Sequence, residues 1–134
     1  MKLSGEKCFV EINVLGYQYA TASLKEDLNW LTCKVSFVNI DVAFSFNCLI
    51  QTYDLAEWMK SIKAESQIAV LAFPEDECSI SIRKENGYIR QVEILYKKEW
   101  MGGDISQKVV FTTQMLVKDV CGELEELLLV YPVL

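Results

Sequence analysis

Alternating apolar and polar side chains dominate the first part of the chain. The alternation runs through residues 8–15 (CFVEINVL), 30–38 (WLTCKVSFV) and 42–50 (VAFSFNCLI). Because successive side chains of a strand point to opposite faces, each segment predicts a strand with one buried face. In the second segment the face opposite the apolar one holds Trp30, Thr32, Lys34 and Ser36. Residues 39–41 make a tight connection to the third segment.

The period changes to that of a helix after residue 53. Asp54 suits the cap of a helix because its carboxylate can accept hydrogen bonds from free N–H groups, and Glu57 completes a capping box. Tyr53 then precedes the cap and would meet Trp58 in a hydrophobic staple. The apolar stripe of this helix is Leu55, Trp58, Met59 and Ile62. Trp58 is therefore interpreted as a core residue rather than a binding residue.

The second half of the chain predicts four more strands and a last helix. The strands include residues 67–73 (QIAVLAF), 88–99 (YIRQVEILYKKE) and 108–115 (KVVFTTQM). Gly102 and Gly103 mark a loop or bulge before the last of them. Residues 116–132 repeat apolar residues with the helical period and end at Pro132. Gly122 inside this helix has no explanation in the sequence.

The hairpin between residues 78–84 and 88–99 has a choice of register. A three-residue loop, Glu85-Asn86-Gly87, pairs Ile80 with Val92 and mostly keeps apolar side chains on one face. A two-residue loop at Asn86-Gly87 would mix the faces. We therefore expect the longer loop, with Gly87 in the left-handed conformation.

These elements predict an α+β fold in one domain, residues 1–134. The expected architecture is a curved antiparallel meander of about seven strands, with one helix after the third strand and a second helix at the C-terminus. The apolar runs of the chain are far shorter than the roughly 20 residues that a helix needs to span a bilayer. Glu6, Lys7 and Glu11 interrupt the segment where a signal peptide needs an apolar core, so we expect a cytoplasmic protein.

Charge and cysteine content narrow the classes of partner. The formal net charge of -6 argues against nucleic acid as a direct partner and permits a basic protein partner. The five cysteines are widely spaced, with no CxxC pair, which indicates neither a disulfide framework nor a zinc site. The first four lie in apolar or alternating runs and are expected to be free, buried thiols.

Candidate catalytic groups are few. The chain has no histidine, and it has neither of the glycine-rich loops that hold phosphate groups. Carboxylates remain, at Glu75-Asp76-Glu77, at Asp104, and at Glu123, Glu125 and Glu126 of the last helix. Paired carboxylates can perform acid–base chemistry when their pKa values differ, but such runs are more often solvated surface. The run at Glu75-Asp76-Glu77 lacks the spaced ligands and glycine of a calcium loop, so we expect no metal and no cofactor.

Three segments together resemble the WapI-type immunity proteins of bacteria. They are DLNWLTCKVSF (residues 27–37), LIQTYDLAEWMKSI (residues 49–62) and VVFTTQMLVKDVCGELEELLLVYP (residues 109–132), in the order and rough spacing of that family. The likeness extends from about Phe9 to Pro132. The matching positions Trp30, Leu31, Leu55 and Trp58 are expected to be structural.

The resemblance implies a cytoplasmic protein that binds a cognate toxin domain, often a nuclease, and blocks it without catalysis. Under this hypothesis the acidic residues Glu75, Asp76, Glu77 and Asp104 are candidate contacts to a basic toxin. A second hypothesis is a small-molecule carrier whose curved sheet encloses an apolar pocket. A third is an enzyme that works through carboxylates in a concave site.

Overall fold

The computed structural model describes residues 1–74, 78–100 and 103–134, and of residues 98–100 and 103–105 it describes the backbone alone. The first four strands are β1 (Lys2–Gly5), β2 (Cys8–Tyr17), β3 (Trp30–Val38) and β4 (Ala43–Gln51). The next four are β5 (Ile68–Ala72), β6 (Cys78–Asn86), β7 (Ile89–Trp100) and β8 (Gly103–Gln114). The helices are α1 (Thr52–Lys63) and α2 (Val117–Val130), and a 3₁₀ turn, η1 (Asp27–Asn29), precedes β3.

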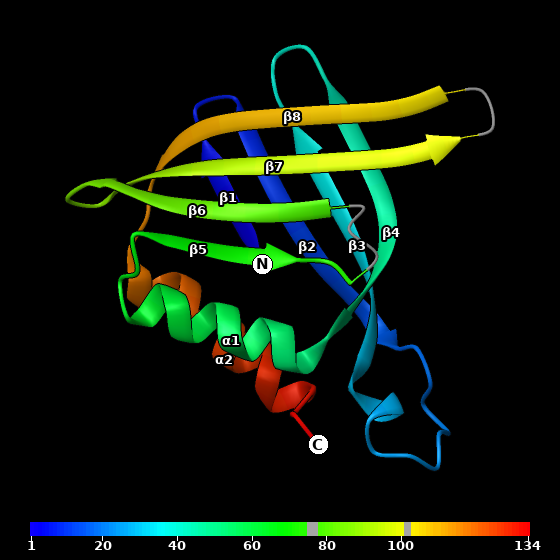
Figure 1. Ribbon diagram of the computed structural model, residues 1–134. Coiled ribbons are helices and arrows are strands. Elements are labelled where there is room, and N and C mark those ends of the chain that lie inside the picture. Colours follow the sequence, from blue (N-terminus) through cyan, green and yellow to red (C-terminus); the bar gives the residue numbers. More distant parts are fainter. Residues whose placement is uncertain (75–77, 101–102) are drawn as a thin grey trace.

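The strands form two antiparallel sheets, so the prediction of one meander of about seven strands is wrong. One sheet has the order β1-β2-β3-β4 and the other β5-β6-β7-β8, as Figure 1 shows. The prediction missed β1, whose four residues KLSG are too few to establish an alternating pattern. Because β1 adds a strand before the first predicted one, α1 follows the fourth described strand and not the third. Strands, antiparallel pairing and two helices were predicted correctly.

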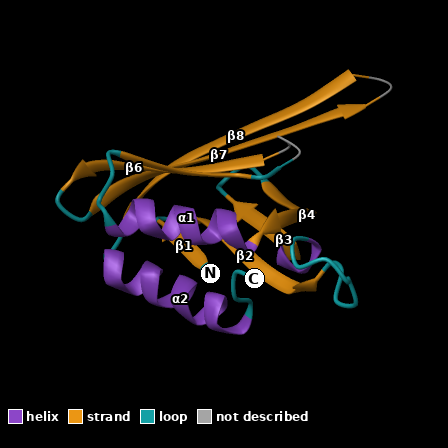
Figure 2. Ribbon diagram, turned by 60° about the horizontal axis from the view of Figure 1, so that its bottom comes forward, coloured by secondary structure: helices purple, strands orange, loops and turns teal. Residues whose placement is uncertain are grey.

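The inner faces of both sheets and both helices share one core. Figures 1 and 2 show the second sheet crossing over the first, with α1 and α2 side by side at one side of the molecule. The buried cluster includes Val35, Phe37, Trp58, Ile80, Ile94 and Leu124. Tyr96 of β7 packs against two aromatic rings of β4, with centroid distances of 4.7 Å to Phe44 and 4.4 Å to Phe46. The core therefore joins β4 of one sheet to β7 of the other.

The two sheets meet most closely where β1 lies against β8. A Cβ atom at Gly5 would stand 2.6 Å from the carbonyl oxygen of Thr112 and 2.8 Å from the ring of Phe111. The hydroxyl of Thr113 donates a hydrogen bond to the carbonyl oxygen of Ser4. Only glycine permits this approach, because any side chain at Gly5 would collide with backbone atoms of β8.

The hairpin between β6 and β7 differs from the predicted one. Ile80 lies opposite Ile94, so the predicted pairing of Ile80 with Val92 and the three-residue loop are wrong. A bulge after Lys84 shifts the register, and the chain turns at Gly87 and the residue after it. Gly87 has a φ of 53°, which confirms its left-handed conformation. The bulge absorbs one residue and thereby sets apolar side chains opposite each other.

Helix α1 begins earlier than the sequence predicts. Its cap is Gln51, whose N–H donates a hydrogen bond of 3.4 Å to Asp54 Oδ2, so Asp54 lies in the first turn. The predicted capping box with Glu57 and the staple between Tyr53 and Trp58 are therefore wrong. Tyr53 is 55% exposed, whereas Trp58 is 1% exposed. The interpretation of Trp58 as a core residue is confirmed.

Replacing Trp58 with Ala should lower the free energy of unfolding by about 3–5 kcal/mol, because the substitution empties a large site in the core. Its Nε1 has no hydrogen-bond partner in the described part of the chain. Trp58→Phe should therefore lower the free energy of unfolding by less, because it also removes a buried N–H that has no hydrogen bond to water in the folded state. Urea unfolding of both variants measures this, and a cost of under about 1 kcal/mol for Trp58→Ala would contradict the buried position.

Gly122 lies in α2, where a side chain would fit. A Cβ atom at this position would meet no heavy atom within 4 Å, and the residue borders a hollow between the two helices. No steric reason for glycine is present there.

Gly122→Ala should therefore stabilise the protein by about 1 kcal/mol, the difference in helix propensity between the two residues. Thermal unfolding measures the change, with Gly5→Ala as the opposite control, because that Cβ would collide with β8. A lower melting temperature for Gly122→Ala would contradict the open position.

Candidate partner-binding site

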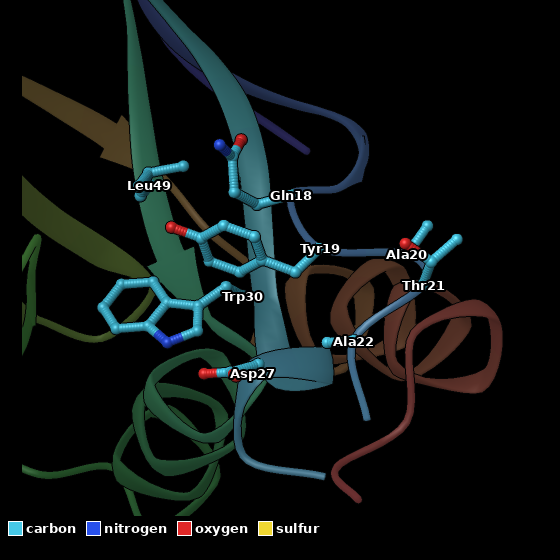
Figure 3. Close-up of a pocket in the computed structure, with 8 residues that line it drawn as sticks. All are labelled: Gln18, Tyr19, Ala20, Thr21, Ala22, Asp27, Trp30 and Leu49. Atoms are coloured by element: carbon cyan, nitrogen blue, oxygen red, sulfur yellow. The ribbon is translucent and has the colours of Figure 1, made fainter. Parts of the chain in front are cut away.

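A hollow lies on the outer face of the first sheet, beside the start of β3. The hollow has a volume of about 730 Å³ and opens on the surface. Its walls come from the loop after β2, from η1, and from the adjoining ends of β3 and β4. Figure 3 shows the ring of Tyr19, the indole of Trp30 and the carboxylate of Asp27 close together in it, with Leu49 on β4.

The 3₁₀ turn η1 places Asp27 and Trp30 together. Residues three apart in a 3₁₀ turn lie one above the other, and Trp30 is three residues after Asp27. The N–H of Trp30 donates a hydrogen bond to the carbonyl oxygen of Asp27. The backbone thus fixes a carboxylate next to an indole.

Two hydrogen bonds hold the loop after β2 against β3. The N–H of Gln18 donates to the carbonyl oxygen of Trp30 at 2.9 Å. The hydroxyl of Thr32 donates to Gln18 Oε1 at 2.5 Å. Tyr19 follows directly in the chain and is 46% exposed. These bonds position the phenol ring at the side of the hollow.

The side chain of Asn29 links η1 by hydrogen bonds to α1 and to Leu134. Its Oδ1 accepts hydrogen bonds from the hydroxyl of Thr52 at 3.0 Å and from the N–H of Leu134 at 2.8 Å. Thr52 is the first residue of α1 and is buried. The turn η1, which forms part of the wall of the hollow, is therefore tied to α1.

The outer edge of β4 adjoins the hollow. The N–H of Asn39 donates to the carbonyl oxygen of Val42, and in antiparallel pairing the bonded positions then recur at every second residue of β4. The backbone groups of Ala43, Ser45, Asn47 and Leu49 consequently face away from β3. No described strand pairs with β4 on that side. The strand AFSFNCLIQ contains neither a charge nor a proline, the usual features that protect an edge strand.

The acidic residues predicted as contacts are not tested by the described part of the structure. Glu75, Asp76 and Glu77 lie outside the described residues. Asp104 belongs to β8, where its backbone is opposite Glu99 of β7, and its side chain is not described. Gly102 also lies outside the described residues, while Gly103 begins β8 and is not in a loop. The contacts remain a prediction.

Sequence reasoning missed the hollow and misjudged Trp30. Leu31, Leu55 and Trp58 are buried, as expected for structural residues, but Trp30 is partly exposed and lines the hollow. One signal was present in the sequence: Trp30 shares a strand face with Thr32, Lys34 and Ser36. A tryptophan on the polar face of a strand indicates a surface role. Tyr19 and Asp27 gave no such signal.

The buried thiols are poor nucleophiles. Cys33, Cys78 and Cys121 are free and buried, whereas Cys8 and Cys48 are only partly buried, contrary to expectation. Burial raises the pKa of the Cys33 and Cys78 thiols to about 12. Such thiols hold almost no reactive thiolate near neutral pH. Among the described side chains, no group of three or more His, Cys, Asp or Glu is placed to bind a metal ion.

The hollow fits neither of the alternative hypotheses from the sequence. A carrier needs an apolar cavity enclosed by its sheets, but core side chains occupy the space between the inner faces, and the hollow lies outside them. A carboxylate enzyme needs two acids in a concave site, and the described lining of this hollow holds a single acid, Asp27. The hollow offers a surface with two aromatic rings, the residue types enriched in protein-binding sites, and one carboxylate.

The fold defines a two-sheet α+β protein, and comparison with known families identifies its family. The model described as the Immunity protein WapI-like family matches residues 2–132. The chain belongs to the WapI-like immunity protein family, as the resemblance of its sequence predicted, and this membership indicates a role in toxin immunity. No curated protein and no solved structure matches the chain. Neither α1 nor α2 has the length and apolar character that a membrane-crossing helix needs, and the described residues contain no other candidate.

Proposed function

We propose that the protein neutralises a cognate bacterial toxin domain, a nuclease, by binding it directly in the cytoplasm, without catalysing a reaction. The observation that carries this proposal is the match of the immunity family over residues 2–132. Neutralisation by binding needs a stable scaffold and a preformed surface. The shared core supplies the scaffold, and the hollow beside β3, held by hydrogen bonds, supplies the surface.

The charge of the chain supports a basic partner. The formal net charge is -6, and nucleases that act on nucleic acid need cationic surfaces for phosphate groups. Opposite charges accelerate the encounter of two proteins and orient them. Within this proposal, Glu75, Asp76, Glu77 and Asp104 contribute contacts to the basic surface of the toxin.

Stoichiometric inhibition is the expected result of a titration. Increasing amounts of the protein are added to the toxin domain encoded beside it, and the nuclease activity that remains is measured. Activity should fall in proportion to the added protein and reach its minimum near one equivalent, because each bound molecule blocks one toxin. Co-expression of the two should also restore growth of cells that make the toxin.

Two results would contradict the proposal. Full inhibition far below one equivalent would indicate an enzyme that modifies the toxin, and no inhibition at excess would exclude binding. The triple variant Glu75→Gln, Asp76→Asn, Glu77→Gln tests the acidic contacts in the same titration. Its control removes three charges elsewhere, at the exposed residues Glu85, Glu123 and Glu126.

A further inference from the structure

The hollow beside β3 combines two aromatic rings with a carboxylate that forms no ion pair with any described side chain. Tyr19 and Trp30 both expose part of their rings there. None of the ion pairs formed by the described residues includes Asp27. Aromatic faces attract cations through their quadrupole, and a free carboxylate attracts them through its charge. We propose that this hollow receives the guanidinium group of an arginine side chain of the partner protein.

The chemistry of the hollow favours arginine over other cations and over anions. A guanidinium group is planar, so it can stack on the indole of Trp30 while it donates two parallel hydrogen bonds to Asp27. A lysine ammonium is more strongly hydrated and has no planar face for stacking. Phosphate groups are repelled by the same carboxylate, so nucleic acid is not the expected occupant. The charged residues of the adjoining segment, Lys25, Glu26 and Asp27, sum to −1.

The three groups are already in place before binding. Backbone hydrogen bonds join Trp30 to both Asp27 and Gln18, and Asn29 ties the turn to α1. A site that is ordered in advance loses less conformational entropy when the ligand binds. An arginine that enters this hollow would therefore be one of the few residues that supply most of the binding energy.

The surroundings favour an arginine that belongs to a protein chain rather than the free amino acid. Leu49 lines the hollow and also belongs to the outer edge of β4. The backbone groups of that edge face away from β3 and can pair with an extended segment. A partner segment along β4 would bring one of its side chains to the hollow. This inference rests on the proposed function for the identity of the partner, but the chemistry of the hollow can be tested without it.

The first test uses a small probe and the full chain. The chain is labelled with ¹⁵N and titrated with N-acetyl-arginine amide or with the uncharged, nearly isosteric N-acetyl-citrulline amide, while NMR follows the indole N–H signals. Trp30→Phe identifies the signal of Trp30. We expect the arginine probe to shift this signal in a saturable manner and the citrulline probe to leave it unchanged. Equal shifts with both probes, or no shift with either, would overturn the inference.

A matched pair of variants tests the role of the carboxylate. Asp27→Asn should abolish the shift caused by the arginine probe. Asp41→Asn makes the same change of charge in the exposed connection after β3, at the opposite end of that strand, and should leave the shift intact. Amide spectra of the unliganded variants report whether each remains folded. A folded Asp27→Asn protein that responds like the wild type would overturn the inference.

The second test uses the toxin domain. Asp27→Asn and Trp30→Ala should each weaken binding by about tenfold or more, as expected for residues at the centre of an interface, while Asp41→Asn should not. If the toxin binds all variants equally, the arginine hollow is wrong and the proposed function stands. If the toxin binds none of them, including the wild type, the proposed function fails, and the probe titration still decides the chemistry of the hollow.

Discussion

The close contact between β1 and β8 is the constraint on which the arrangement of the two sheets depends. It requires a residue without a side chain at Gly5, since a Cβ atom there would lie 2.6 Å from a backbone oxygen of β8. Through this contact the inner faces of both sheets enclose one core, to which α1 and α2 contribute Trp58 and Leu124. A four-residue strand at the edge of the first sheet thus provides a close contact to the second sheet.

The same arrangement explains where a partner can bind. Because β1 at one edge of the first sheet lies against β8, the other edge, β4, is the one that faces outward. The loop after β2 and the turn η1 lie at the end of that sheet, and hydrogen bonds from Gln18 and Asn29 fix them there. Hydrogen bonds therefore connect the walls of the hollow around Trp30 to β3 and α1. Under the proposed function, a preformed surface lowers the entropic cost of binding the toxin.

The sequence predicted the local elements better than their assembly. Alternation identified β2, β3 and β4, and the helical period identified Trp58 as core, because these patterns arise from a single strand or helix facing one core. The packing of one sheet on the other includes the contact of Gly5 with Thr112, which are far apart in the chain and leave no periodic signal. The hollow likewise joins Tyr19, Asp27 and Leu49 from separate segments. Only Trp30, an aromatic residue on a polar strand face, gave a signal for it, and the sequence prediction interpreted Trp30 as structural.

Hydrogen–deuterium exchange of the full chain, alone and with its toxin domain, tests the central claim most directly, because it locates the interface without mutation. We expect slower exchange in the complex for the backbone amides of residues 18–30 and for the outward amides of β4, including Asn47 and Leu49. Amides on the exposed side of α2, near Glu123 and Glu126, should exchange at the same rate in both states. Protection confined to α2, with residues 18–30 unchanged, would contradict an interface at the hollow and at the edge of β4.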